Sequence, residues 1–355
     1  MIRKERDISI DVLRGIAVLA LFAGNSMGII SPLKSQPYFL HLVFTFGAPL
    51  FIVLASYMAS VNREVKSRPF SYYLKRCVML LFTAAFLDGI VWNILPFTEY
   101  DVLCVIGVIM PLCYLLFKGN SLTALLFIAA VLGVTAWMQQ RLPYQDYPLN
   151  FPLFTDDAAD WDKLSWGYVI KAALYDGWFP LFPWMAYAGI GFLFARYRKL
   201  NGSFAKSKPV VIGLLLAVGG FLWWYTAYSE VTAFDRLVDR DPYGELFYPP
   251  TVAYMITSFG VCLLLIAGMD SVRGWSGWRP LCVLGEASMF NYILQSTTCA
   301  VLFTPLFEEN QQPLWVSLCC YAGLTVVGFC LSLGVRRMKQ KVKRRNFLFN
   351  FYFGG

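Results

Sequence analysis

The sequence predicts an all-α polytopic membrane protein that has about ten transmembrane helices and both ends of the chain in the cytoplasm. Three observations predict it, namely the composition, the length of the apolar runs and the placement of basic residues. Of the 355 residues, 58% are hydrophobic and 15% are charged, whereas soluble domains carry about 25% charged residues. Such a chain cannot hide its apolar side chains in one water-soluble core.

The apolar runs have the length that a helical membrane span requires. A helix needs about 20 apolar residues to cross roughly 30 Å of hydrocarbon, and only helices and closed barrels satisfy their own backbone groups in lipid. These runs are too long and continuous for barrel strands. They predict one transmembrane domain, residues 1–355, with spans near residues 8–30, 39–61, 73–95, 102–117, 122–138, 178–195, 209–228, 250–269, 281–303 and 314–335.

Lysine and arginine predict the orientation, because cytoplasmic connections carry their excess. With the N-terminus inside, 23 of the 30 basic residues are cytoplasmic, and the outer loops, two of which are long (residues 139–166 and 229–248), hold most of the acids. The net charge of +8 is therefore a sign of topology and excludes a nucleic-acid partner. The expected partners are membrane lipids. The basic stretch 336–345 is first of all typical of a stop-transfer anchor, and it can also touch anionic lipid head groups.

The first span is long and lacks a small-residue cleavage pattern, so we expect it to be retained. A compact ten-span form favours a bacterial inner (cytoplasmic) membrane. All nine cysteines lie in or beside apolar spans and the chain has one histidine. We therefore expect no disulfide framework and no metal site. A tightly bound cofactor is not expected either.

Ionisable groups inside a span are costly, so each of them is a candidate for function. In the first span Asp11 and Arg14 lie one helical turn apart and can pair near the cytoplasmic surface. Gly15 lets another backbone or a ligand approach. Asn25 lies eleven residues beyond Arg14, on the same face and about 16 Å away along the axis. This face can line a path from the inner surface toward the outer leaflet.

His41 begins the second span on the outer side, where it can meet Asn25 across a short turn. A neutral imidazole is a natural general base for an alcohol or an amine, although a lone interfacial histidine is more often a structural hydrogen-bonding group. Asp88 lies deep in the third span, so it must be paired, protonated or facing a cavity. Arg14 is one conceivable partner for Asp88.

The ninth span carries a polar stripe whose members are three and four residues apart on one helical face. Such a stripe must face protein or a cavity, because amides exposed to hydrocarbon cost several kcal/mol. It either holds helices together or lines a site. Glu286, nearer the cytoplasmic end, belongs to the same site or marks the interface. The stripe consists of Ser288, Asn291, Gln295 and Thr298.

Several of these segments resemble the transmembrane acyltransferase superfamily, which contains heparan-alpha-glucosaminide N-acetyltransferase and its bacterial relatives. The order of the matches follows the family over nearly the whole chain, and the end of the first motif together with the last match looks most like a bacterial branch of unassigned function. The matching segments are residues 9–17, Gly47-Ala48-Pro49-Leu50-Phe51, Val102-Leu103 with Ile106-Gly107, Leu181-Phe182-Pro183-Trp184, Tyr248-Pro249-Pro250-Thr251 and residues 285–296.

The resemblance implies that an acyl group passes from a cytoplasmic donor, commonly acetyl-CoA or another acyl-CoA, to a sugar or another hydroxyl or amino acceptor outside. It implies His41 as general base, Asn25 as the group that orients it or binds the acyl carbonyl, and Asp11 as the residue that holds Arg14 beside Gly15 at the donor. Better-understood members often have histidine where this chain has Asn25 and Gln295. The residues expected to line the tunnel are Trp184, Glu286, Ser288, Asn291 and Gln295.

Two other classes of function fit the same sequence. One is a carrier or flippase, in which the polar faces form a translocation route without covalent chemistry. The other is a membrane enzyme that uses Asp88 or Glu286 as an acid on a lipid-like substrate. A single acyltransferase site requires that His41, Asn25 and the polar stripe surround one cavity. The acceptor, the acyl chain and the oligomeric state stay open, with a homodimer as one expectation.

Overall fold

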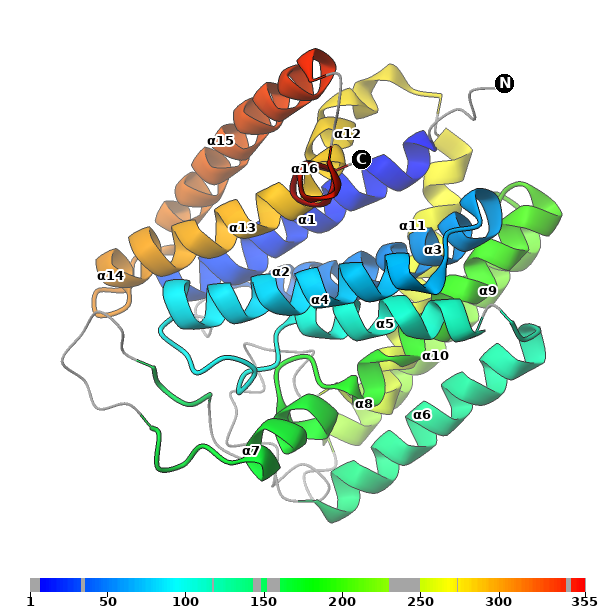
Figure 1. Ribbon diagram of the computed structural model, residues 1–355, viewed down its shortest axis with the longest axis horizontal. Helices are drawn as coiled ribbons and strands as arrows, with labels where there is room; N and C mark the ends of the chain where they lie inside the picture. Colours follow the sequence, from blue (N-terminus) through cyan, green and yellow to red (C-terminus); the bar gives the residue numbers. More distant parts are fainter. Residues whose placement is uncertain are drawn as a thin grey trace. The chain divides into compact units, whose positions relative to one another are not determined.

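The computed structural model confirms the all-α class (Figure 1). Outside the helices, the described residues contain a single isolated β-bridge, between Ile94 and Asn150, and no named strand. The structure describes residues 7–32, 36–116, 118–142, 148–151, 160–229, 250–272, 274–342 and 346–354.

Seven helical segments of the described chain are long and apolar enough to cross a membrane. The predicted count of ten spans is therefore not confirmed, and the count and the orientation stay predictions. Two of these segments, Phe39–Glu64 and Trp166–Asn201, contain more than one helix. The seven segments are Ile8–Ile30, Phe39–Glu64, Ser121–Arg141, Trp166–Asn201, Ser207–Thr226, Val252–Val272 and Leu314–Lys341.

The three remaining predicted spans, 73–95, 102–117 and 281–303, are shorter or interrupted. The first contains α4 (Phe70–Phe86), which passes into a short π-helix, η2 (Leu87–Val91). The second is α5 (Val102–Leu116), an apolar helix of 15 residues. The third is divided at Ala287, as the next paragraph describes. Continuous hydropathy hides such breaks, because an apolar residue can occupy a kink as readily as a helix.

At Ala287 the backbone leaves helical geometry, with φ −115° and ψ +29°. This residue separates α12 (Arg279–Glu286) from α13 (Ser288–Thr298). A π-helix, η6 (Cys299–Phe303), and α14 (Thr304–Phe307) continue the chain. The predicted polar stripe lies wholly on α13, whereas Glu286 ends the preceding helix.

Contacts divide the chain into two compact units. Unit 1 comprises Met1–Leu54, Ser203–Gly213 and Val261–Gly355, and unit 2 comprises Ala55–Gly202 and Leu214–Gly260. Three helices contribute residues to both units. These helices are α3 (Gly47–Lys66), α10 (Ser207–Ser229) and α11 (Val252–Val272). The single transmembrane domain stays a prediction.

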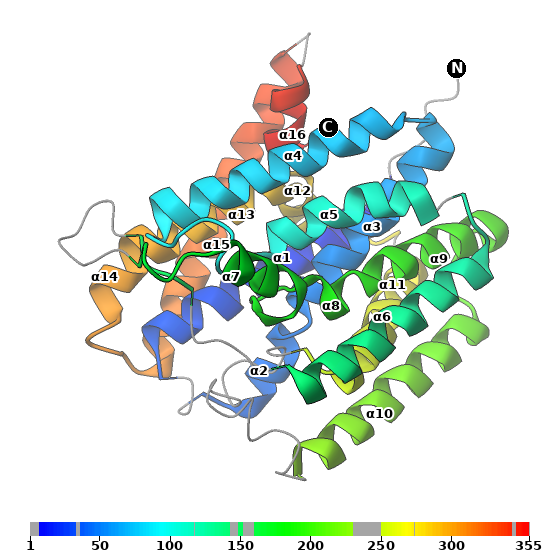
Figure 2. The ribbon, with the colours of Figure 1, turned by 60° about the horizontal axis from the view of Figure 1, so that its bottom comes forward.

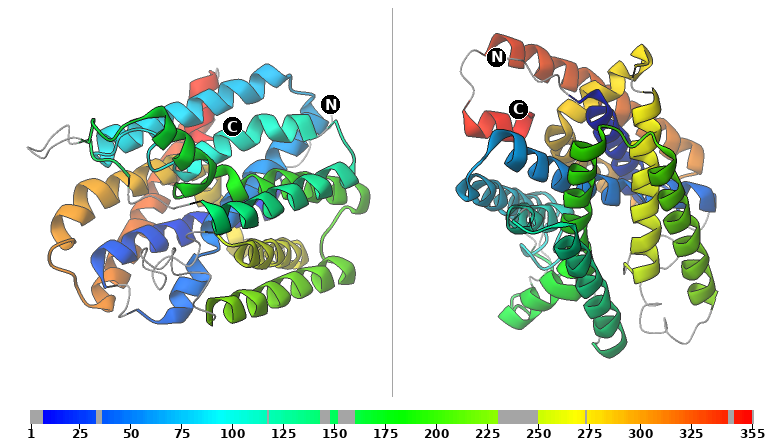
Figure 3. Two further views of the ribbon diagram at one scale, coloured as in Figure 1. Left: turned by 90° about the horizontal axis from the view of Figure 1, so that it is seen from below. Right: turned by 90° about the vertical axis from the view of Figure 1, so that its right-hand side faces the viewer.

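In unit 1, α1 (Ile8–Ile30) packs along α12 and α13 and against α15 (Leu314–Lys341), as Figures 1 and 3 show. The short α2 (Tyr38–Phe44) also contacts α1. At the end of the chain α16 (Phe347–Phe353) turns back onto α13. The rings of Phe290 and Phe353 lie 6.0 Å apart in that contact.

In unit 2, α4 lies beside α5, and α6 (Ser121–Arg141) lies beside α9 (Ala186–Asn201), as Figure 2 shows. Three short elements precede α9, namely α7 (Trp166–Lys171), η3 (Ala172–Asp176) and α8 (Leu181–Trp184). The core between the helices is aromatic. Trp184 stacks on Tyr187 at 5.7 Å, and the Tyr187 and Ser258 hydroxyls share a hydrogen bond of 2.6 Å.

The two predicted outer loops differ in how much of them is described. In the first, 139–166, α6 continues to Arg141, and a described stretch hydrogen-bonds the segment after η2: the Leu95 amide donates to the Leu149 carbonyl at 2.8 Å, and the Phe151 amide to the Asn93 carbonyl at 2.7 Å. The second loop, 229–248, lies outside the described residues except for Ser229 at the end of α10. Tyr248 and Pro249 of the fifth matching segment also lie outside them.

Candidate active site

The centre of the candidate site in unit 1 is a hydrogen-bonded pair of amides on two helices. The Asn25 Nδ2 of α1 donates to the Gln295 Oε1 of α13 at 3.2 Å. Gln295 is fully buried and passes a second, weaker hydrogen bond from its Nε2 to the Cys299 sulfur at 3.4 Å. A row of polar groups therefore runs from α1 through α13 into η6.

Asn25 is itself exposed, although it lies within an apolar helix. A side chain placed on the neighbouring Gly24 would meet nothing within 4 Å, so this part of α1 faces open space. A polar amide at membrane depth needs water or a polar partner on its open side.

Asn291, one turn before Gln295, stabilises the break in the predicted ninth span. Its Nδ2 donates to the Leu284 carbonyl oxygen at 3.1 Å and to the Ser332 Oγ of α15 at 2.9 Å. Leu284 lies in the last turn of α12, and its carbonyl also accepts from the Ala287 amide at 3.2 Å, so Asn291 is a second donor at the point where the helix ends. Asn291 thus joins three helices, which supports the reading of the stripe as a group that holds helices together.

The other end of the stripe differs in its partners. Ser288 is buried at the start of α13. The Thr298 hydroxyl donates to the Leu294 carbonyl of its own helix at 2.8 Å. Thr298 is therefore the one member of the stripe whose observed hydrogen bond stays within α13.

Glu286 ends α12 beside two basic residues of α15. Its carboxylate lies 3.8 Å from the Arg336 guanidinium, and its backbone carbonyl accepts a hydrogen bond of 3.2 Å from the Lys339 ammonium. A cation at a helix C-terminus offsets the negative end of the helix dipole. Glu286 is thus held in the junction between α12 and α15, and its place in a tunnel stays a prediction.

The cytoplasmic end predicted for α1 packs against α12 through glycines. A methyl group on Gly15 would overlap the Leu281 carbonyl, and one on Gly285 would overlap the Asp11 carbonyl and lie 3.0 Å from the Arg14 Cβ. The space that we expected Gly15 to offer to a backbone or a ligand is therefore taken by the backbone of α12. Asp11 is buried at this crossing.

His41 lies in α2 of unit 1, and its side chain is 8% exposed. Its backbone carbonyl accepts from the Thr45 amide at 2.9 Å, which ends the short helix. The contact expected between His41 and Asn25 stays a prediction, since the observed partner of the Asn25 amide is Gln295.

Two predicted site residues, Asp88 and Trp184, belong to unit 2. Asp88 is buried in η2, and its Oδ2 accepts from the Phe97 amide at 3.1 Å. Phe97 has a φ of +68°, a conformation that costs a non-glycine residue energy, so the carboxylate stabilises a strained turn. Trp184 is fully buried in the aromatic core. A shared cavity with the unit 1 residues stays a prediction for both.

Sequence reasoning missed Cys299 and Ser332, the partners of Gln295 and Asn291 in the stripe, and Lys339, the partner of the Glu286 carbonyl. A signal for Cys299 existed, because it follows Gln295 by one helical turn and extends the same face. Ser332 and Lys339 lie on another helix, so no spacing along α13 could have indicated them.

Comparison with known proteins identifies the family over the first part of the chain. A family model described as "Heparan-alpha-glucosaminide N-acetyltransferase, catalytic" matches residues 6–227, which is more than half of the chain. No curated protein matches the sequence. The matched region includes Asn25, His41 and Asp88, whereas α12 and α13 follow it. The chain belongs to the heparan-alpha-glucosaminide N-acetyltransferase catalytic family of membrane proteins.

Proposed function

We propose that this protein is an acyltransferase that moves an acyl group, typically acetyl, from a CoA-type donor on the cytoplasmic side to a hydroxyl or amino acceptor at the outer face. The observation that carries the proposal is the Asn25–Gln295 pair. It joins the opening motif of the matched family region to the polar helix that follows that region. A bacterial inner membrane and a glycan acceptor are part of the same proposal.

In the proposed reaction His41 acts as general base. The imidazole takes a proton from the acceptor, whose oxygen or nitrogen attacks the carbonyl carbon of the thioester. The carbon–sulfur bond breaks, and the CoA thiolate leaves and takes the proton from the imidazolium. The acceptor gains the acyl group and the donor becomes free CoA, so no further reactant is needed.

Asn25 and Gln295 are neutral amides and serve as positioning groups rather than bases. The exposed Asn25 can turn a donor N–H toward an acyl carbonyl, while the hydrogen bond to Cys299 fixes the position of the Gln295 side chain. Amide donors aimed at a developing oxyanion are an established way to lower an acyl-transfer barrier. Asp11 and Arg14 form the proposed donor side, where a guanidinium would attract CoA phosphates.

The test is acetyl transfer by the purified protein from radiolabelled acetyl-CoA to a panel of amino sugars and envelope glycans. We expect transfer in the wild type, a loss of at least about 100-fold in His41→Ala, and a loss of about tenfold in Asn25→Ala. Ser26→Ala is a matched control for Asn25, because the observed hydrogen bond of the Ser26 hydroxyl goes back to the Phe22 carbonyl of the same helix.

The result that would overturn the base assignment is undiminished transfer in His41→Ala. Counterflow of an unmodified acceptor across proteoliposomes, without any acyl transfer, would instead establish the carrier alternative.

A further inference from the structure

Outside the candidate site, the described part of unit 2 contains a cavity between α3 and α9. The two helices touch closely at Gly191, where an added methyl group would come within 2.6 Å of the Tyr57 amide nitrogen. One to two turns farther on, toward the end of both helices, they enclose about 180 Å³. The residues that line this cavity are Glu64, Phe192, Ala195, Arg196 and Lys199.

The cavity is apolar at its floor and cationic at its rim. Phe192, Ala195, Arg196 and Lys199 follow one another at helical spacing, so they share one face of α9. Phe192 and Ala195 are buried, whereas Arg196 is exposed and the Lys199 side chain is 61% exposed. A ligand that fits both regions is amphipathic, with an apolar part inside and an anion outside.

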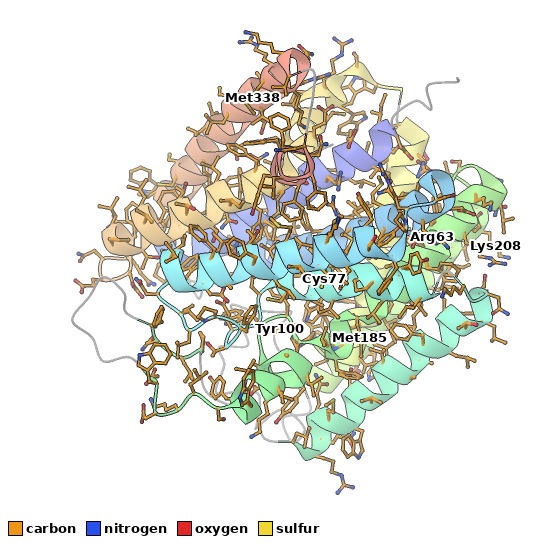
Figure 4. All side chains as sticks on the ribbon, viewed as in Figure 1. Arg63, Cys77, Tyr100, Met185, Lys208 and Met338 are labelled. Carbon is orange, nitrogen blue, oxygen red and sulfur yellow. The ribbon has the colours of Figure 1, made fainter. Side chains whose placement is uncertain are left out.

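The charges around the rim favour an anion. Glu64 is the acid of the lining, and its carboxylate is already paired with the Lys199 ammonium. Arg196 has no carboxylate partner among the described residues. Beside Glu64, Arg63 (labelled in Figure 4) lies 4.5 Å above the Tyr114 ring and adds another positive charge to this end of α3.

We propose that this cavity binds the phosphate group of an anionic phospholipid from the cytoplasmic leaflet. Arg196 and Lys199 hold the phosphate oxygens, and the glycerol and first methylene groups lie on Phe192 and Ala195. The predicted topology places the end of α9 in the basic cytoplasmic connection, where anionic lipid head groups are found. A small soluble anion would leave the apolar floor unused, which favours the lipid. This site is separate from acyl transfer.

The test is a titration of the purified full-length protein with phosphatidylglycerol, followed by native mass spectrometry, with phosphatidylcholine as the comparison lipid. Arg196→Gln should weaken phosphatidylglycerol binding about five- to tenfold, because a charge-assisted hydrogen bond to the phosphate is lost. Glu64→Gln should strengthen it about threefold, because the Lys199 ammonium then no longer divides its interactions between the Glu64 carboxylate and the phosphate.

Lys206→Gln is the matched control, since Lys206 is exposed, lies in the same predicted connection and does not line the cavity. It should change the affinity less than twofold. The gain expected for Glu64→Gln keeps the test decisive, because a damaged fold cannot bind more tightly. Equal losses in Arg196→Gln and Lys206→Gln, or equal binding of both lipids, would overturn the site. Displacement of the lipid by an equal concentration of glycerol 3-phosphate would overturn the lipid as its ligand.

Discussion

The Asn25 side chain donates a hydrogen bond of 3.2 Å to the Gln295 side chain across 270 positions of sequence. The resemblance to the transmembrane acyltransferase superfamily implies histidine at both positions in better-understood members. The direct contact of Asn25 and Gln295 places both residues in one cluster of unit 1, so the pair is the first target for mutagenesis.

A double-mutant cycle measures that contact. Asn25→Ala and Gln295→Ala should each lower stability, and their coupling free energy should be about 0.5–1 kcal/mol, the range of interhelical hydrogen bonds in membranes. Thermal unfolding of the four variants in one detergent gives the value. The control pair Ser26→Ala and Thr298→Ala should be additive, because both hydroxyls bond to their own helices. Additive effects for Asn25 and Gln295 would show that the hydrogen bond contributes nothing.

The close contact between α1 and α12 at Gly15 should tolerate no added side chain. Gly15→Ala forces a methyl group onto the Leu281 carbonyl and should cost about 1–3 kcal/mol, seen as a lower melting temperature. Gly24→Ala on the same helix is the control, since its methyl group meets nothing within 4 Å. It should be neutral or slightly stabilising, because alanine is the better helix former. Equal melting temperatures for the two variants would contradict the crossing.

Asn291 should be required as a donor. Asn291→Ala removes the hydrogen bonds to the Leu284 carbonyl and to Ser332, at a cost of about 1–2 kcal/mol. Asn291→Asp should be worse, because a carboxylate would face the carbonyl oxygen of Leu284. Melting temperatures compare the two, with the exposed Asn201→Ala as a control that should change little. An Asp variant as stable as the Ala variant would exclude the donor role.

Substitution of Glu286 distinguishes a role in acid catalysis from a structural role. Its carboxylate lies 3.8 Å from Arg336, a partly exposed pair of the kind that contributes less than about 1 kcal/mol. Glu286→Gln should therefore keep acyl transfer within about twofold of wild type and lower the melting temperature only slightly. Loss of activity by 100-fold or more, without unfolding, would instead identify Glu286 as a catalytic acid.

Local patterns predicted the helical class and the face that the polar residues share. The stripe on α13 is one face because helical geometry fixes the positions of Asn291 and Gln295 relative to each other. The sequence predicts that another group approaches α1 closely at Gly15, but it does not decide between a helix backbone and a ligand. Packing decided for the helix, since the backbone of α12 occupies that space.

The count of ten spans is not confirmed, because the predicted spans are interrupted where hydropathy shows no break. The π-helix at Asp88 and the kink at Ala287 preserve a continuous apolar composition, so a hydropathy window passes over them. The groups that make the kink tolerable, Lys339 and Ser332, lie on α15 and bond to α12 and α13 only in the folded chain.

By itself the sequence determined that this is a helical membrane protein, because lipid obliges each apolar segment to satisfy its own backbone hydrogen bonds locally. It also determined which side chains are polar enough to matter. Only the tertiary structure decided that Asn25 bonds to Gln295 and that α1 meets α12 at Gly15. Those contacts depend on how distant helices cross, and crossing is set by packing across the whole unit rather than by spacing along one helix.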